Sequence, residues 1–317
     1  MPILQRLAAA LAWLGRRGTR ALAVSMFLGL AMPQLAVHVK PHLGEVVFVM
    51  LTFSYLRTDP AAFRRQFMTP GLVVIAAAWI MIVLPLLFGL LYLICGLPAL
   101  VPNLYTIMIL QLVTTPITSS AAFAALLGLD VAFSLAVLIV SNALSPITTV
   151  AFAYVFLGAA LFSPIELGVR LFLLFAGAGL AAYIIRRIAG QPRIERESAM
   201  LDGLNVVAVF FFAVAAMESI PRHVVADPLF ALDLFGLIVV LSVAWVGLSV
   251  LVFWRAGLNR GLVIGLLTGF RNIAAMMAVV GASLPDIAWF YFALVQIPIF
   301  LFPWALQPLA RRIGEKR

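Results

Sequence analysis

The sequence is dominated by apolar runs long enough to cross the hydrocarbon core of a lipid bilayer. One crossing takes about 20 residues of helix, because each residue adds about 1.5 Å and the core is about 30 Å thick. Hydrophobic residues make up 65% of the chain and charged residues 10%, whereas soluble proteins carry about 25% charged residues. We therefore expect an all-α integral membrane protein.

Short polar or charged segments separate the apolar runs, so the membrane crossings can be counted. We predict about ten transmembrane helices, at residues 21–38, 43–56, 70–94, 104–127, 131–159, 166–185, 202–218, 229–254, 262–283 and 287–309. Residues 1–20 are similar to a signal peptide in hydrophobicity, but Arg16, Arg17 and Arg20 follow their apolar part. We expect residues 1–20 to form a helix on the membrane surface.

The distribution of lysine and arginine predicts the orientation of the helices. If the N-terminus is cytoplasmic, the 21 lysines and arginines fall on cytoplasmic segments, except Lys40, Arg170 and Arg222 at outer helix ends and Arg271 inside a span. Positive charge is retained on the cytoplasmic side, so both termini are expected there. The net charge of +9 then reflects topology beside a lipid bilayer and not nucleic-acid binding. The expected location is a bacterial inner membrane or a plasma membrane.

Two stretches of the sequence align without gaps when the chain is shifted by 156 residues. LVTTPITSSAAFAALLGLDVAF starts at Leu112 and falls on TGFRNIAAMMAVVGASLPDIAW, which starts at Thr268. With five spans in each half, the two copies have opposite orientations in the membrane, as in an inverted repeat. We predict a first five-helix repeat over residues 21–160 and a second over 161–317, within one membrane domain.

The fourth and ninth predicted helices are both interrupted within these aligned stretches. In the fourth helix, Pro116 lies in the segment TTPITSS and cannot donate a backbone hydrogen bond, so the helix is expected to open there. In the ninth helix, Gly269 lies in the segment TGFRN, before Arg271 and Asn272. Irregular backbone at membrane depth persists only where protein or water covers it. We therefore predict broken helices at both positions.

These segments resemble the motifs of the bile acid:sodium symporter family. TTPITSSA followed by LDVAFSLAVLIVSNALSPITTV is similar to the family's CPGGTASN followed by a run like GNVALSVAVTTVSTLLSPLLTP. LTGFRN stands where the family's ninth helix carries EVGMQN, and VVFVMLTFSYLRTDPAAFRRQF is similar to IMFGMGLTL followed by a basic loop. The likeness covers most of the chain.

The resemblance implies a ten-helix carrier with panel and core domains, in which helices four and nine cross at their unwound centres. It also implies that an organic anion is carried with sodium. The family's substrate contacts fall on Thr118 and Asn272 of this chain. A residual ion site is expected to involve Ser120, Ser134 and Thr268.

Most of the family's sodium-coordinating positions have lost their oxygen ligands. Those positions are Ile80, Ala121, Leu138, Leu267 and Arg271. Because a sodium ion needs several converging oxygen ligands, ordinary sodium coupling through side chains is not expected. Sodium bound by backbone carbonyls at the helix breaks is an alternative, and no other metal or cofactor is predicted.

Arg271 is placed near the hydrophobic centre of the ninth helix. A central arginine costs about 2.5–3.5 kcal/mol on insertion scales and does not lose its proton, so it must face protein, water or an anion. In one interpretation it binds a carboxylate or sulfonate bidentately, together with Thr114, Thr115, Thr118 and Asn272. In the other it is structural and bonds to carbonyls exposed by the broken helices, with help from Thr114 or Thr115.

These features favour a secondary transporter that moves an organic anion by alternating access. A non-transporting receptor or scaffold with the same fold is the alternative from a different class. An enzyme is not expected, because the sequence has no His-Glu-x-x-His helix, no usefully spaced acid pair and no nucleophile with a recognisable base. The sequence does not predict an oligomeric state.

Overall fold

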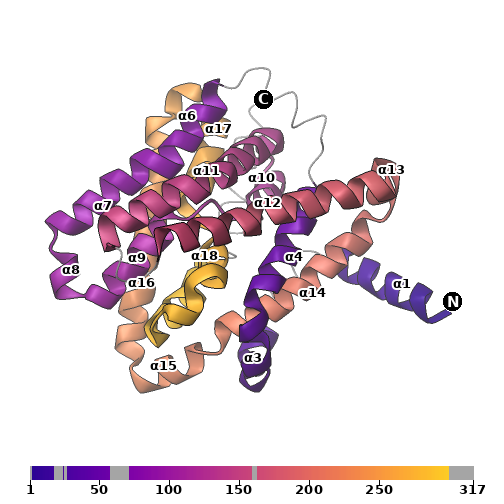
Figure 1. Ribbon diagram of the computed structural model, residues 1–317, viewed down its shortest axis with the longest axis horizontal. Coiled ribbons are helices and arrows are strands. Elements are labelled where there is room, and N and C mark those ends of the chain that lie inside the picture. Colours follow the sequence, from indigo (N-terminus) through magenta and orange to yellow (C-terminus); the bar gives the residue numbers. More distant parts are fainter. Residues whose placement is uncertain (1, 18–23, 25–26, 58–70, 159–162, 300–317) are drawn as a thin grey trace. The chain divides into compact units, whose positions relative to one another are not determined.

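Figure 1 shows the computed structural model, which describes residues 2–17, 24, 27–57, 71–158 and 163–299. Every named element in these ranges is a helix, which confirms the predicted all-α class. The chain divides into two compact units, one formed by residues 1–58 and 173–226 and the other by residues 59–172 and 227–317. Each unit therefore combines a segment from the first half of the sequence with a segment from the second.

The two units share one helix, α12, whose residues 164–172 belong to unit 2 and 173–189 to unit 1. The helices of unit 1 are α1 (Pro2–Arg16), α3 (Pro33–Val39), η1 (Lys40–His42), α4 (Leu43–Leu56), the second part of α12 (Pro164–Ala189), α13 (Gln191–Arg196), α14 (Ser198–Met217) and α15 (Ile220–Ala226). Unit 2 contains α6 (Gly71–Ala78), the π-helix η2 (Trp79–Val83), α7 (Leu84–Ile94), α8 (Leu97–Leu100), α9 (Pro102–Val113), α10 (Ser120–Leu126), α11 (Val131–Leu157), the first part of α12, α16 (Pro228–Val252), η3 (Trp254–Ala256), α17 (Leu258–Gly269), α18 (Ile273–Val280), η4 (Gly281–Ser283) and the helix Asp286–Ile299.

Six described helices are long and apolar enough to cross a membrane, in agreement with the predicted integral membrane protein. They are Gln34–Leu56, Gly71–Ile94, Val131–Leu157, Pro164–Ala189, Ser198–Ala226 and Pro228–Val252. The last five overlap the predicted third, fifth, sixth, seventh and eighth spans. The predicted tenth span is described only as far as Ile299.

The structure differs from the predicted boundary between the first and second spans. Residues 39–42 do not form a loop, because α3 continues through η1 into α4. Pro41 lies in the first turn of η1, where a proline is tolerated because its missing N–H would have no helical partner. The polar triplet Lys40-Pro41-His42 therefore does not end the helix. Residues 18–20 of the predicted surface helix and residues 21–23, 25 and 26 of the predicted first span lie outside the described residues.

Within unit 1, α14 packs against α1, α3 and α4. The contact with α1 is very close at two glycines. A Cβ atom at Gly203 would lie 1.9 Å from the Leu11 carbonyl oxygen, and one at Gly15 would lie 2.0 Å from the Ala199 carbonyl oxygen. Small residues allow helix backbones in membranes to approach in this way. The N-terminal segment predicted as a surface helix is thus helical and packs along α14.

Within unit 2, α17 packs against α16 through glycines on one face. A Cβ atom at Gly265 would lie 3.0 Å from the Val246 carbonyl oxygen, and one at Gly269 would lie 2.4 Å from the Val246 Cγ2 atom. This close packing fixes the end of α17, which is the point at which the predicted ninth helix is interrupted.

Candidate functional site

The predicted fourth helix is divided into α9 and α10. Helix α9 has 12 residues, or about 18 Å at about 1.5 Å per residue, which is too short to cross the bilayer core. Thr114 then adopts an extended conformation (φ −76°, ψ 167°), and α10 begins at Ser120. Residues before a proline are pushed towards extended backbone, and Thr115-Pro116 follows directly. The break includes Pro116, the residue at which the sequence places it.

The predicted ninth helix is divided into α17 and α18. Helix α17 ends at Gly269 after 12 residues, and Phe270 is extended (φ −110°, ψ 99°). The Asn272 side chain then caps α18, because its Oδ1 accepts a hydrogen bond from the Ala275 N–H at 3.2 Å. The first N–H groups of a helix have no acceptor within the helix, and an asparagine side chain at this position supplies one. The chain is non-helical only over Phe270, Arg271 and Asn272 between the two helices.

The two breaks pair with each other through their backbones. Pro116 and Arg271 form an isolated antiparallel β-bridge. The Ile117 N–H donates to the Phe270 carbonyl at 2.9 Å, and the Asn272 N–H donates to the Thr115 carbonyl at 2.7 Å. Backbone polar groups at membrane depth must be satisfied within the protein. Each broken helix therefore supplies the hydrogen-bond partners that the other has lost.

A side chain strengthens this pairing. The Thr114 hydroxyl donates to the Asn272 carbonyl at 3.1 Å. Thr114 is buried, with 2% of its surface exposed, so this hydroxyl has little access to solvent. The predicted polar cluster at the fourth helix thus contributes to the pairing of the breaks through both its backbone and its side chains.

Arg271 lies at the junction of the two breaks and is completely buried. Its Nη1 donates to the Thr114 carbonyl at 2.9 Å, and its Nη2 donates to the Ile80 carbonyl at 3.1 Å. The first acceptor is freed by the break after α9. These are the bonds expected in the structural interpretation of Arg271, and they leave the Nε–H without an acceptor in the part of the chain that the structure describes.

The Ile80 carbonyl has no backbone partner within its own helix because of the π-helix η2 and the proline that follows. In η2 the Leu84 N–H bonds to the Trp79 carbonyl, five residues earlier. The next bond in this register would run from residue 85 to Ile80, but Pro85 has no N–H. π-Bulges are often found at functional sites. Arg271 supplies the donor that Pro85 cannot.

The charge of Arg271 is not balanced by a carboxylate in the part of the chain that the structure describes, where the ion pairs involve other residues. Its Cζ lies 5.9 Å from the centroid of the Trp245 ring on α16, within the range of a cation–π interaction. A buried charge is costly unless it is paired and hydrogen-bonded. The site thus combines a permanent positive charge with two carbonyl dipoles and an indole ring.

The other predicted site residues lie in or beside the breaks, except Ser134, which lies on α11. Thr115, Ser120 and Ser134 are buried, and their hydroxyls have no hydrogen-bond partner among the described residues. Thr118 is partly exposed. The Thr268 hydroxyl donates to the Ile264 carbonyl of its own helix at 2.6 Å, so it does not point freely towards an ion.

Three groups that interact with Arg271 could not be selected from the sequence: the Ile80 carbonyl, the Trp245 ring and, electrostatically, Tyr92. The isoleucine side chain at position 80 gives no indication that its backbone carbonyl accepts a hydrogen bond. The only signal is Pro85 five residues later, which has no N–H to donate to that carbonyl. Trp245 and Tyr92 are aromatic residues in apolar helices, a pattern that packed cores also show.

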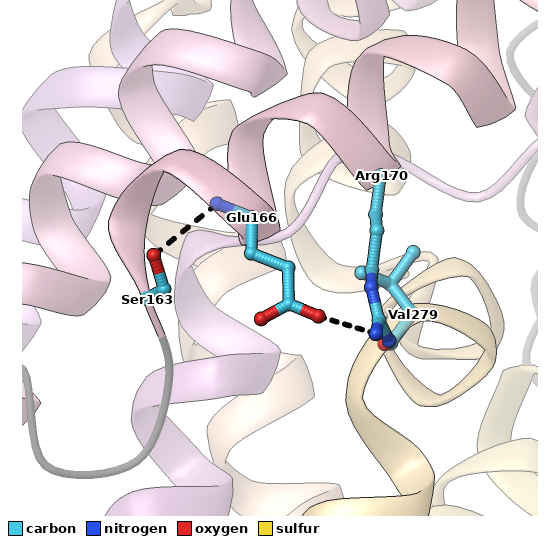
Figure 2. Close-up of polar contacts among 4 residues, drawn as sticks. All are labelled: Ser163, Glu166, Arg170 and Val279. Carbon is cyan, nitrogen blue, oxygen red and sulfur yellow. Dashed lines mark hydrogen bonds and ion pairs between the residues drawn. The ribbon is translucent and has the colours of Figure 1, made fainter.

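A second polar contact holds the far end of α18 (Figure 2). Arg170 on α12 donates from Nη1 to the Val279 carbonyl at 2.9 Å, and its Nη2 pairs with Glu166 one turn earlier. Ser163 accepts a hydrogen bond from the Glu166 N–H at 3.5 Å. A basic side chain that bonds the last carbonyls of a helix stabilises its C-terminus. Both ends of α18 are therefore fixed, one by Asn272 and the other by Arg170.

No family model matches the sequence, and no curated protein matches it either. The function is therefore inferred from the geometry of the two breaks and from the chemistry of Arg271.

Proposed function

We propose that the protein is a secondary transporter that carries an organic anion, a carboxylate or a sulfonate, across the membrane by alternating access. One observation carries this proposal: two interrupted apolar helices pair at their breaks around a buried guanidinium with no carboxylate partner among the described residues. An ionisable residue inside a membrane marks a functional site by default. An anion would supply the negative charge that the surroundings of Arg271 lack.

The proposed architecture has ten spans in two inverted five-helix repeats, as in the bile acid:sodium symporter family. The composition of the two units supports it, because unit 1 includes the predicted spans one, two and seven and most of span six, and unit 2 includes the predicted spans three to five and eight to ten. In the proposed repeat, spans one and two correspond to spans six and seven. In this architecture the two units act as the panel and core bodies of the carrier, both termini are cytoplasmic, and the membrane is a bacterial inner membrane or a plasma membrane.

We further propose that transport does not require sodium. The carbonyls exposed by the breaks and by the π-helix already accept hydrogen bonds: Thr114 and Ile80 from Arg271, Thr115 from Asn272, and Phe270 from Ile117. A sodium ion bound by backbone oxygens would have to compete with these donors. The guanidinium supplies the positive charge permanently.

The test is uptake by purified protein in proteoliposomes. The radiolabelled probes are pyruvate, succinate and taurocholate, which represent a monocarboxylate, a dicarboxylate and a sulfonate. Each is measured with sodium and with sodium replaced by N-methylglucamine, against protein-free liposomes. We expect saturable uptake of at least one anion at the same rate in both buffers. Saturable binding without uptake or exchange would instead support the receptor, and uptake only with sodium would support ion ligation by the backbone.

A further inference from the structure

Several buried hydrogen-bond donors at and around Arg271 have no acceptor among the described residues, including the Thr115 hydroxyl and the Asn272 side-chain amide. Three more are the Nε–H of Arg271, the indole Nε1–H of Trp245 on α16 and the hydroxyl of Tyr92 on α7. Arg271 and Trp245 are 0% exposed and Tyr92 is 4% exposed, so solvent does not satisfy these groups. The last three donors therefore come from three separate segments of unit 2.

Aromatic contacts place these donors in one cluster. The Arg271 Cζ lies 5.9 Å from the Trp245 ring centroid. The Phe88 ring lies 5.8 Å from Trp245 and 6.3 Å from Tyr92, with edge-to-face geometry in both pairs. The Tyr92 phenol and the Arg271 guanidinium also interact electrostatically. Phe88 thus contacts both the indole and the phenol.

The unsatisfied donors contrast with equivalent groups elsewhere in unit 2. The Trp79 indole donates to the Ser249 hydroxyl at 2.9 Å, and the Tyr105 hydroxyl donates to the Phe156 carbonyl at 2.9 Å. The buried Tyr291 hydroxyl bonds to Gln111. In these three cases the fold provides an acceptor for a tryptophan or tyrosine, as buried polar groups require. Only an acceptor from outside the described residues can do so for Trp245 and Tyr92.

The chemistry of the cluster defines the missing acceptor. A guanidinium and an indole can only donate hydrogen bonds. The cluster holds one permanent positive charge, so one negative charge balances it. We propose that the Arg271 Nε, the Trp245 Nε1 and the Tyr92 hydroxyl form a binding site for a small monovalent anion. This inference rests on the proposed function, and it narrows the cargo to an anion with a single charge at its head.

A carboxylate of the cargo and a free halide ion share this chemistry. Chloride and acetate are therefore the two probes, and sulfate is the divalent control. Binding to the purified protein is measured by isothermal titration calorimetry and by the shift in melting temperature, since a ligand that binds only the folded state stabilises it. We expect chloride or acetate to bind and raise the melting temperature, and sulfate not to.

Two variants remove single donors and keep the rings: Trp245→Phe and Tyr92→Phe. Hydrogen bonds to charged groups are strong enough that each variant is expected to weaken anion binding about tenfold or more. Trp79→Phe and Tyr105→Phe are the matched controls, because they remove donors that already have protein acceptors. The controls are expected to keep the wild-type affinity. Size-exclusion profiles identify any variant that does not fold.

Equal anion affinity in the wild type and in both cluster variants would overturn the inference, as would the absence of chloride and acetate binding to the wild type. If both chloride and acetate compete with a transported anion for binding, the site holds the charged head of the cargo. If only chloride competes, the site holds a halide ion. The proposed function fails separately. Anion uptake that is unaffected in Trp245→Phe and Tyr92→Phe would refute only the site, and anion binding without uptake would refute only the transporter.

Discussion

Arg271 donates a hydrogen bond from Nη2 to the carbonyl of Ile80, a residue 191 positions earlier in the chain. The bond replaces the one that Pro85 cannot make in the π-helical turn of η2. The same guanidinium bonds to the Thr114 carbonyl at the end of α9. One side chain from the ninth helix thus satisfies defects in the third and the fourth, and its charge lies where the two breaks meet.

Replacing Pro85 tests the link between the π-helix and Arg271. In Pro85→Ala a backbone N–H becomes available to the helix, so the Ile80 carbonyl gains a competing donor. We expect anion uptake to fall about tenfold, because a hydrogen bond to a charged group is worth about 1.5–3 kcal/mol. We also expect the melting temperature to stay the same or rise, since an interior proline costs a helix about 3 kcal/mol.

The control for this substitution is Pro146→Ala in α11, which also removes a proline from within a helix. It is expected to leave uptake unchanged. If Pro85→Ala and Pro146→Ala both transport at the wild-type rate, Arg271 does not depend on the Ile80 carbonyl.

The packing of Gly269 on α16 predicts a loss of stability in Gly269→Ala. The added Cβ would lie 2.4 Å from Val246 Cγ2 and 3.0 Å from the Ser242 carbonyl oxygen. Overpacking of this kind typically costs about 1–3 kcal/mol. A lower melting temperature is expected, with partial recovery in the double variant Gly269→Ala/Val246→Ala.

Gly247→Ala on α16 is the matched control, because no atom lies within 4 Å of the added Cβ. Its melting temperature is expected to stay at or above that of the wild type, since alanine favours a helix over glycine by about 1 kcal/mol. Equal destabilisation in both variants would show that the α16–α17 contact is not the cause.

Substitutions of Asn272 can test the capping of α18 and the charge of the site separately. In Asn272→Asp the carboxylate can still accept the Ala275 N–H, so the free energy of unfolding is expected to change by less than about 1 kcal/mol. The same carboxylate stands next to Arg271 in sequence and balances its charge. Anion uptake is therefore expected to be lost while the protein stays folded.

Asn272→Ser is the companion variant, because serine caps a helix without adding charge. It is expected to retain more uptake than Asn272→Asp. Wild-type uptake in the aspartate variant would mean that the charge of Arg271 is not used to bind the anion.

The proposed topology can be tested with the single cysteine of the chain. Cys95 is exposed at the end of α7, the outer end of the predicted third span. A membrane-impermeant maleimide is expected to label it in intact cells. In a Cys95→Ser background, a cysteine at Arg193, in a predicted cytoplasmic segment, is expected to react only after permeabilisation. The opposite pattern would invert the topology.

The breaks at Pro116 and Gly269 could be predicted because their causes are local: a missing N–H in one helix and a flexible, polar segment in the other. The five longest spans could be predicted for a similar reason, since hydrophobicity and length are properties of a continuous segment. The helix through residues 39–42 was not, because Pro41 is compatible with a first helical turn as well as with a loop.

The contacts of Arg271 depend on backbone atoms that the sequence does not display. Nothing about an isoleucine at position 80 indicates that its carbonyl accepts from a side chain 191 positions away. Similarly, Trp245 and Tyr92 lack an acceptor among the described residues, and this is a property of the folded chain.

The most direct measurement of the central claim is anion uptake by Arg271→Gln in sodium-free proteoliposomes, beside Arg170→Gln. Both variants remove an arginine that donates to a carbonyl, but only Arg271 is buried at the junction of the breaks. We predict that Arg271→Gln is folded and lacks uptake, whereas Arg170→Gln transports at about the wild-type rate. Uptake by Arg271→Gln equal to that of the wild type would contradict a role for the guanidinium in carrying the anion.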